Sequence, residues 1–481
     1  MRIIKLIIIW VLLAGLMSAC SNFLNVTPKN VISMDDLPSV KQALGGYMAG
    51  LRDDMSGVNG NTCPRSPFVS SQFSEFVPYT DEWDLSSFAD NDMTDDEIRQ
   101  ADWRRESTAY YWSSYYSIIG FMNLILYEAE TAEGEESMRD YLMGEAYVNR
   151  AYCFFKLVQY YAPYDNNELG VPICLDTYED FENVSVKRHT QREVYTQILS
   201  DLEQAAIRIE RTAPRAEYNV LYSESVINRL YAIVYHFKAL SAAADSDDWD
   251  NAIKYASRET DGKTLCADPD VLKQIFDFAQ ATVDYNPETS VRVGNSGAGN
   301  IYGYNVNQEF LDNYFREEDD IRKELYFNIT TDWMGISKLS MNKYNNVSWL
   351  AWYYRYNAFR LSEIFLIHAE ALVRTDQVEE ARKLLRRFKE ARYTENVVVP
   401  DGKDAVLADI LRERRKEFVA EGDIVWMDMK RLGVKMERTV AGVTYKLNGA
   451  GDYRYTFPIP NSELENNKEM KEQNPGWILN D

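Results

Sequence analysis

The stretch R360-L361-S362-E363-I364-F365-L366-I367-H368-A369-E370-A371, followed by D376-Q377-V378-E379, decides the fold. Apolar side chains recur here with helical spacing, which predicts helices over residues 358–374 and 377–392 with only two residues between them. Asp376 stands where a carboxylate caps the first turn of the second helix. Because so short a connection places two helices side by side and antiparallel, the stretch predicts a helical hairpin.

The same helical periodicity recurs along the chain, and one helix carries a clear start signal. Thr190 and Glu193 form a capping box, in which each side chain accepts from the backbone N–H of the other residue. The apolar face that follows consists of Val194, Ile198, Leu202, Ala205 and Ile209. Further helices are predicted over the ranges 107–131, 140–162, 222–245, 248–259 and 403–421. Helices that pair across short gaps are typical of tetratricopeptide-type stacks, although a strict period of about 34 residues is absent.

Three stretches between the helices lack this periodicity. They cover residues 52–104, 262–356 and 433–481, and the last contains the strand-like alternation V443-T444-Y445-K446-L447. Long irregular segments on a helical scaffold are where ligand contacts usually lie. The predicted fold is therefore mostly α: a tetratricopeptide-like helical-hairpin scaffold with long irregular loop insertions and a few short strands.

The N-terminus has the pattern of a lipoprotein signal peptide. A basic start with Arg2 and Lys5 leads into the apolar run 6–17, and small residues directly precede Cys20. The run is too short to span a bilayer, which takes about 20 apolar residues. The pattern predicts a signal peptide over residues 1–19 and lipid attachment at Cys20, which anchors the protein without spanning the membrane. The alternative is ordinary signal-peptidase cleavage that leaves a free N-terminus.

Charge and cysteine spacing limit the classes of partner. The formal net charge is −23 at pH 7, which repels nucleic acid and favours a neutral or cationic ligand. Besides Cys20 the chain has Cys63, Cys153, Cys174 and Cys266, none of them in C-x-x-C spacing. Neither a zinc site nor a redox site is therefore predicted, and Cys153 is expected to pack as a small hydrophobic residue.

Several segments, in chain order, resemble the signatures of the SusD/RagB family of outer-membrane nutrient-binding lipoproteins. They are C20-S21-N22-F23-L24-N25-V26-T27-P28, W112-S113-S114-Y115-Y116-S117-I118-I119-G120-F121-M122-N123, G144-E145-A146-Y147-V148-N149-R150-A151-Y152, R192-E193-V194-Y195 with the residues up to A205, R360 to A371, and E413-R414-R415-K416-E417-F418-V419-A420-E421-G422. The C-terminal F457-P458-I459-P460-N461 and Q473-N474-P475-G476-W477 are similar to the end of the family pattern. The resemblance covers nearly all of the chain after residue 19.

This resemblance implies a function and a location. Relatives bind an oligosaccharide, or occasionally a peptide, at the cell surface and act as the lid of a SusC-like TonB-dependent transporter. For this chain it implies a non-enzymatic lipoprotein of the outer membrane that faces the cell exterior. It also implies a division into a tether over residues 20–45, an N-terminal SusD-like helical part over 46–262 and a C-terminal SusD/RagB part over 263–481, together one globular unit.

The candidate binding residues are loop aromatics with polar neighbours. Sugars present C–H faces ringed by hydroxyl groups, which match an aromatic face beside amide or carboxylate groups. The candidates are Tyr79, Trp83, Asp84, Tyr302, Tyr304, Trp333, Trp349 and Trp352. Packing is the alternative role for Trp349 and Trp352, and a structural role or transporter contact is the alternative for Trp83 and Trp333. Aromatic residues on helices, such as Tyr111 and Trp112, are expected to pack between hairpins.

No catalytic pattern stands out in the sequence. His189, His236 and His368 lack metal-site spacing, and His368 is expected in the core. The run E413-R414-R415-K416-E417 is interpreted as a structural, solvated or i,i+4-paired helix face. The sequence predicts no catalytic residues, no cofactor and no metal site. A structural calcium ion is the alternative to the absence of a metal. The alternative functions are a peptide-binding lid of the same family and a lipid-anchored glycan hydrolase.

Overall fold

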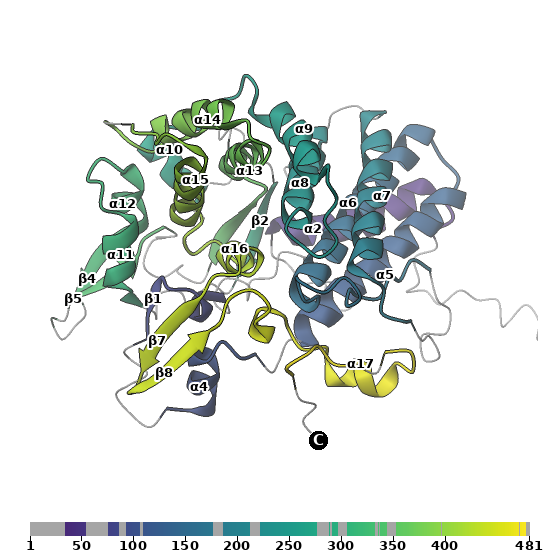
Figure 1. Cartoon of the computed structure of the whole chain (residues 1–481). Coiled ribbons are helices and arrows are strands. Elements are labelled where there is room, and N and C mark those ends of the chain that lie inside the picture. The colour runs from purple at the N-terminus through teal and green to yellow at the C-terminus, as the bar shows by residue number, and fades with distance from the viewer. Residues whose placement is uncertain are drawn as a thin grey trace, which may run out of the picture.

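The structure of the chain, a computed structural model, is mostly helical (Figure 1). It describes most residues between Met34 and Trp477, and the structural statements below concern those residues. The described ranges are 34–53, 76–85, 93–105, 109–176, 186–211, 222–276, 288, 291–296, 305–331, 335, 337–343, 353–395, 397–470 and 472–477.

A row of long helices, each packed on the next, forms the scaffold. In order the row is α5 (Ala109–Thr131), α6 (Glu136–Tyr161), α7 (Gln191–Glu210), α8 (Glu224–Lys238), α9 (Asp248–Thr260), α13 (Leu361–Arg374) and α14 (Val378–Glu390). Figure 1 shows this row running from α5, α6 and α7 on the right to α13 and α14 at the upper left. Chain neighbours in the row pair as hairpins. This arrangement confirms the predicted mostly α, tetratricopeptide-like scaffold.

Local sequence signals explain where these helices begin. At the start of α7, Thr190 Oγ1 accepts from the Glu193 backbone N–H at 3.2 Å, and the Glu193 carboxylate accepts from the Thr190 N–H at 2.7 Å. This confirms the predicted capping box. The predicted apolar face of α7 is buried at Val194, Ile198, Leu202 and Ala205, and half-buried at Ile209.

The turn between α13 and α14 has three residues, one more than predicted, and a different cap. Asp376 does not cap α14, because its backbone lies in the left-handed region at φ 64° and Gln377 occupies the N-cap position. The Asp376 carboxylate instead accepts from Lys403 Nζ at 2.6 Å. So tight a turn needs one residue with positive φ, a conformation that Asp tolerates better than most residues.

The first described helix shortens the expected tether. α2 (Leu37–Asp53) begins inside the range 20–45, and its side chains Leu37, Val40 and Leu44 are buried in the core. Residues from Leu37 onward therefore belong to the folded body. The division at residue 262 stays a prediction, although one continuous hydrophobic core holds residues from both sides of it.

Further elements surround the helical row. They are η2 (Val77–Tyr79), α4 (Asp95–Ala101), α10 (Pro269–Ile275), α11 (Gln308–Tyr314), α12 (Ile321–Tyr326), α15 (Lys403–Glu417), α16 (Ile424–Leu432), η6 (Tyr453–Tyr455) and α17 (Asn461–Asn466). The predicted strand-like alternation forms β8 (Val443–Leu447), which pairs antiparallel with β7 (Met436–Val440). Within the described ranges, no helix combines the length and the apolar character that crossing a membrane requires.

Several residues take the core positions that the sequence predicts. Tyr111, Trp112 and Cys153 are buried between helices, and His368 is 7% exposed, with its ring Nδ1 2.8 Å from the Thr260 hydroxyl. Each position contributes packing area or a satisfied polar contact to the core. For these residues the structural roles are confirmed.

A buried ionic cluster joins α8, α13 and α16. The ring of His236 is fully buried, with Nε2 2.8 Å from Glu370 Oε2, and Arg431 donates to both Glu370 oxygens at 3.0 Å. Burial, assisted by Arg431 and Arg414 and opposed by Glu370, lowers the pKa of His236 to about 4. Asp428, the other acidic group nearby, accepts from Arg414 and Arg431. His236 is therefore neutral in the folded protein at neutral pH.

We expect the free energy of unfolding to decrease as the pH falls from about 6.5 to about 4. Over this window the unfolded chain protonates His236 with its ordinary pKa, whereas the folded protein does not, so acid favours unfolding. The pKa difference corresponds to a loss on the order of 3 kcal/mol. Denaturant titrations at several pH values measure it. His236→Gln should flatten the dependence, and an equal slope in both proteins would contradict the assignment.

Candidate functional site

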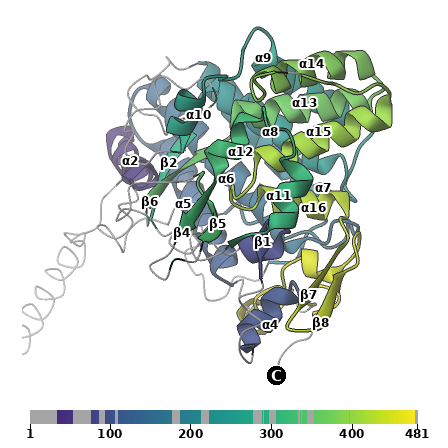
Figure 2. The same cartoon turned by 90° about the vertical axis from the view of Figure 1, so that its left-hand side faces the viewer.

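Three short antiparallel sheets carry the irregular segments in which the loop candidates lie. β1 (Trp83–Asp84) pairs with β3 (Asn305–Val306), β2 (Val291–Ser296) pairs with β6 (Tyr353–Ala358), and β4 (Phe327–Thr331) pairs with β5 (Ser337–Met341). β3 also contacts β5, so two of these sheets are neighbours (Figure 2).

Most of the predicted aromatic candidates lie outside the described residues. These are Tyr302, Tyr304, Trp333, Trp349 and Trp352, together with the predicted lipid-bearing Cys20. Their chain neighbours are described: Tyr304 directly precedes β3, Trp333 lies in the sequence between β4 and β5, and Trp352 directly precedes β6. These residues remain predictions, attached in sequence to the three short sheets.

Tyr79 and Trp83 are buried in the core. Trp83 is 3% exposed and Tyr79 is 5% exposed. The Tyr79 ring lies 5.4 Å from that of Trp426, and the Arg105 guanidinium covers it at 4.8 Å from the ring centroid. Both rings are therefore packed in the core, which is the alternative role that the sequence indicates for Trp83.

Asp84 points to the other side of the same strand. Successive side chains of a strand alternate between its faces, so Trp83 and Val306 are buried while Asp84 and its direct partner Asn305 are half-exposed. Directly opposed residues of an antiparallel pair have side chains in reach of one another. A carboxylate and an amide thus stand together next to the segment that holds Tyr302 and Tyr304.

Two further polar groups lie in the segments that flank this strand pair, Asp81 before β1 and Tyr314 at the end of α11 after β3. The Asp81 side chain is 41% exposed and pairs with Arg415, and the half-buried Tyr314 lies in the electrostatic neighbourhood of both. The Arg415 guanidinium also stacks over the Phe310 ring at 4.7 Å. We call Asp84 and Asn305, with Asp81 and Tyr314 in the flanking segments, the β1–β3 face. Asn305 is not among the sequence-predicted candidates, although it follows directly after Tyr304.

A buried ionic cluster lies at the end of α15 and contacts the Asp81 side chain of this face. Arg415 pairs with Asp81 and Glu82, and Glu82 also accepts from the Ala420 backbone N–H at 3.3 Å. The interpretation of E413–E417 as a solvated helix face is wrong, because Glu413, Arg414, Lys416 and Glu417 are at most 1% exposed. The predicted structural role of the run is retained, and its counter-charges come from distant segments.

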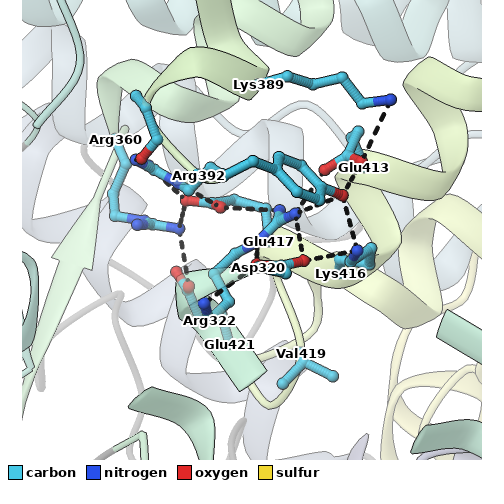
Figure 3. A network of polar contacts seen from close by, with 12 residues as sticks. Asp320, Arg322, Arg360, Lys389, Arg392, Glu413, Lys416, Glu417, Val419 and Glu421 are labelled. Carbon is cyan, nitrogen blue, oxygen red and sulfur yellow. Dashed lines mark hydrogen bonds and ion pairs between the residues drawn. The ribbon is translucent and has the colours of Figure 1, made fainter. Parts of the chain in front are cut away.

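Glu417 is the centre of this cluster, as Figure 3 shows. Its carboxylate accepts from Arg360 at 2.9 Å, from Arg392 at 2.9 Å through two nitrogens, and from Arg322 at 3.4 Å. Burial alone raises the pKa of Glu417, but the guanidinium groups of Arg392 and Arg360 outweigh it and hold the pKa well below its usual range. The carboxylate is therefore ionised. We call Glu417 with Arg322, Arg360, Arg392 and Glu421, together with the Arg415–Glu82 pair on the same helix end, the α15 cluster.

The α15 cluster fixes the chain next to the short sheets. Arg360, two residues after β6, also donates to Glu421 at 2.9 Å. Lys343, two residues after β5, pairs with Glu421 at 2.5 Å and donates to the Glu417 and Val419 carbonyls. Burial lowers the pKa of Lys343 to about 8, and Glu421 opposes that shift. The end of α15 thus fixes the positions of β5 and β6, the strands to which the loops with predicted candidates connect.

The chemistry of the β1–β3 face suits hydrogen bonding to a polyhydroxylated ligand. Carboxylates accept from hydroxyl groups, an amide both donates and accepts, and a half-buried phenol ring offers an apolar face. Among the described residues, no group of three or more His, Cys, Asp or Glu side chains is placed to hold a metal ion.

Comparisons with known proteins bear on the whole chain. Residues 22–235 match a family profile described as starch-binding associating with outer membrane, and residues 279–477 match the profile of the SusD family. The SusD-like protein P38 of Formosa agariphila is 21% identical over 96% of both chains.

Solved structures share the fold. A SusD superfamily protein from Bacteroides vulgatus superposes with a TM-score of 0.71 at 20% identity, over 92% of this chain and 99% of that one. A putative sugar binding protein from the same organism gives a TM-score of 0.70 at 22% identity, over 93% and 100% of the two chains. At these identities the likeness establishes the helical fold.

Proposed function

This chain belongs to the SusD/RagB family, a family of carbohydrate-binding, outer-membrane-associated proteins, and on that premise we propose that it binds an oligosaccharide without cleaving it. The single observation that carries the proposal is the β1–β3 face, where Asp84 and Asn305 stand opposed and half-exposed beside an aromatic-rich segment. The SusD-like carbohydrate binding protein and the putative sugar binding protein from Bacteroides vulgatus have names that agree with this ligand class.

The proposed complex includes rings as well as polar groups. We place Tyr302, Tyr304, Trp333, Trp349 and Trp352 in the role of stacking surfaces for sugar rings, with the β1–β3 face supplying hydrogen bonds. Aromatic stacking provides affinity, and directed hydrogen bonds provide selectivity among sugars. A rigid support below the polar groups reduces the conformational entropy lost on binding. The α15 cluster is that support.

The proposed location and partner follow from the N-terminus and the family. Lipid attached at Cys20 would hold the protein on the outer membrane, facing the cell exterior. There it would pass its ligand to a SusC-like TonB-dependent transporter and act as its lid, because ligand bound between the two proteins favours the closed state.

We expect Asp84→Ala and Asn305→Ala each to weaken oligosaccharide binding by at least tenfold, with little change in the denaturation midpoint. Both side chains are half-exposed, so the core does not depend on them, whereas a buried hydroxyl group of the ligand left without its partner costs about 1–3 kcal/mol. Titration calorimetry with an oligosaccharide that the unmodified protein binds measures the loss.

Asp250→Ala is the matched control. Asp250 is an exposed residue of α9, which lies at the top of Figure 1, whereas β1 lies at the lower left. This variant should retain the affinity of the unmodified protein. If Asp84→Ala and Asn305→Ala bind as tightly as Asp250→Ala, the β1–β3 face is not the site.

A further inference from the structure

A cavity lies on a part of the molecule away from the residues of the β1–β3 face. It has a volume of about 280 Å³ and opens between the turn that follows α6, the last turn of α16 and the segment around η6. The side chains that matter for its chemistry are Tyr164, Asp165, Asn166, Lys430, Asp452 and Tyr453. None of them belongs to the β1–β3 face, so the cavity is a separate feature.

The C-terminal motif N474-P475-G476-W477 builds one wall of this cavity. The Tyr453 and Trp477 rings meet edge to face at 5.2 Å, and Trp477 Nε1 donates to the Thr456 carbonyl at 2.8 Å. Gly476 has φ 85°, and a Cβ there would lie 2.4 Å from Tyr453 Cγ, so only glycine allows this approach. The Tyr453 ring is therefore held in place before any ligand arrives.

The carboxylate of Asp452 is also fixed. It accepts from Arg454 Nε at 2.8 Å and from the Asn448 backbone N–H at 2.8 Å. These bonds, together with burial that opposes them, leave the pKa of Asp452 below its usual value, so the group is ionised. Further N–H groups of the same two residues also donate to it, so Asp452 places a fixed negative charge in the wall of the cavity.

Lys430 lies at the inner end of the cavity. It is 5% exposed and donates to the Gln159 carbonyl at 2.5 Å and the Ala162 carbonyl at 2.8 Å, at the C-terminal end of α6. An ammonium group has three N–H donors, so these two bonds leave one for a further acceptor. Burial lowers the pKa of Lys430 to about 7, and the carboxylate of Asp165 opposes the shift.

These groups select against most ligand classes. An anion would face the carboxylates of Asp165 and Asp452, a cation would face the ammonium form of Lys430, and an apolar ligand would displace water from these groups without offering a hydrogen bond in return. A neutral ligand that carries several hydroxyl groups can donate to the Asp165 carboxylate and accept from Lys430, while Tyr164 and Tyr453 cover its C–H faces. The volume lies just below the roughly 300–1,000 Å³ of pockets for drug-sized ligands, which suits one sugar ring.

We propose that this cavity is a second saccharide site, which takes a single neutral sugar unit and is separate from the β1–β3 face. The ligand class in this inference rests on the proposed function, whereas the location of the site rests on the cavity itself. Asp165 is exposed and would accept a hydrogen bond from the sugar, whereas Lys430 is buried and would donate one to it.

The test is saturation-transfer NMR on the full purified protein with D-glucose, D-galactose, D-mannose and N-acetylglucosamine as probes. We expect at least one of them to bind, Asp165→Ala to weaken that binding at least fivefold, and Asp250→Ala, at an exposed position of α9, to leave it unchanged. Tyr453→Ala should weaken it as well, whereas Tyr453→Phe should retain most of it, which shows that the ring and not the hydroxyl group is required.

The outcomes distinguish this inference from the proposed function. Absence of binding by all four sugars, or binding that Asp165→Ala leaves intact, overturns the second site even when an oligosaccharide still binds in a manner sensitive to Asp84→Ala. The protein could also bind a single sugar in a manner that requires Asp165 and bind no oligosaccharide. That result supports the second site and contradicts the proposed function.

Discussion

Glu417→Gln is expected to lower the free energy of unfolding by about 3–5 kcal/mol, the usual cost of removing one partner from a buried ion pair. The substitution keeps the shape of the side chain but removes the charge that Arg322, Arg360 and Arg392 share. The three guanidinium groups are at most 1% exposed, so water cannot replace the lost carboxylate. Denaturant titration monitored by circular dichroism measures the change.

The control for this prediction is Glu203→Gln. Glu203 is an exposed residue of α7 and lies outside the α15 cluster, so its replacement should change stability by less than about 0.5 kcal/mol. Equal stabilities of the two variants would mean that Glu417 does not hold the cluster together.

Trp83→Ala is expected to lower the free energy of unfolding by about 3–5 kcal/mol, the range for truncating a large buried aromatic residue. The Trp83 side chain belongs to the main core cluster and is 3% exposed, so its removal leaves a cavity that the fixed strands β1 and β3 cannot fill. Thermal unfolding of the variant beside the unmodified protein measures the loss.

Trp83→Phe separates packing from ligand stacking. It keeps an aromatic ring in the core and should cost much less than Trp83→Ala, because most of the buried area remains. If Trp83→Ala unfolds at the same temperature as the unmodified protein and loses ligand binding, the ring serves the ligand and the burial described here does not govern its role.

The helical part of the fold is readable from the sequence because its signals are local. The capping box of Thr190 and Glu193 and the apolar repeat of α7 act within a few residues of one another. The helix pair of 358–374 and 377–392 appears with its short connection intact. The N-cap assigned to Asp376 failed because a three-residue turn imposes its own backbone conformation, which outweighs the intrinsic capping preference.

The α15 cluster could not be predicted, because its partners come from distant parts of the chain. Arg322 lies 95 residues before Glu417, and Glu82 lies 333 residues before Arg415. A run of alternating charges on a helix looks solvated unless those partners are known. In the structure these buried charges connect α15 to the ends of several short strands.

The sequence indicates the region of the candidate site more clearly than its residues. The short sheets lie within or at the edge of the predicted irregular segments 52–104 and 262–356, and Asp84 is half-buried there. Which side chain of β1 points inward depends on the register with β3, and this register places Trp83 in the core and Asp84 outside. The same register brings Asn305 opposite Asp84, a pairing that no local pattern could reveal.

The most direct test of the account is titration calorimetry of the purified protein against a panel of neutral and acidic oligosaccharides, with each sample then chromatographed. The account predicts heat of binding with at least one neutral oligosaccharide, weakened by Asp84→Ala, and recovery of every sugar at its original length. Shortened products would contradict it in favour of a glycan hydrolase. Binding of peptides with no heat from any sugar would contradict it in favour of a peptide-binding lid.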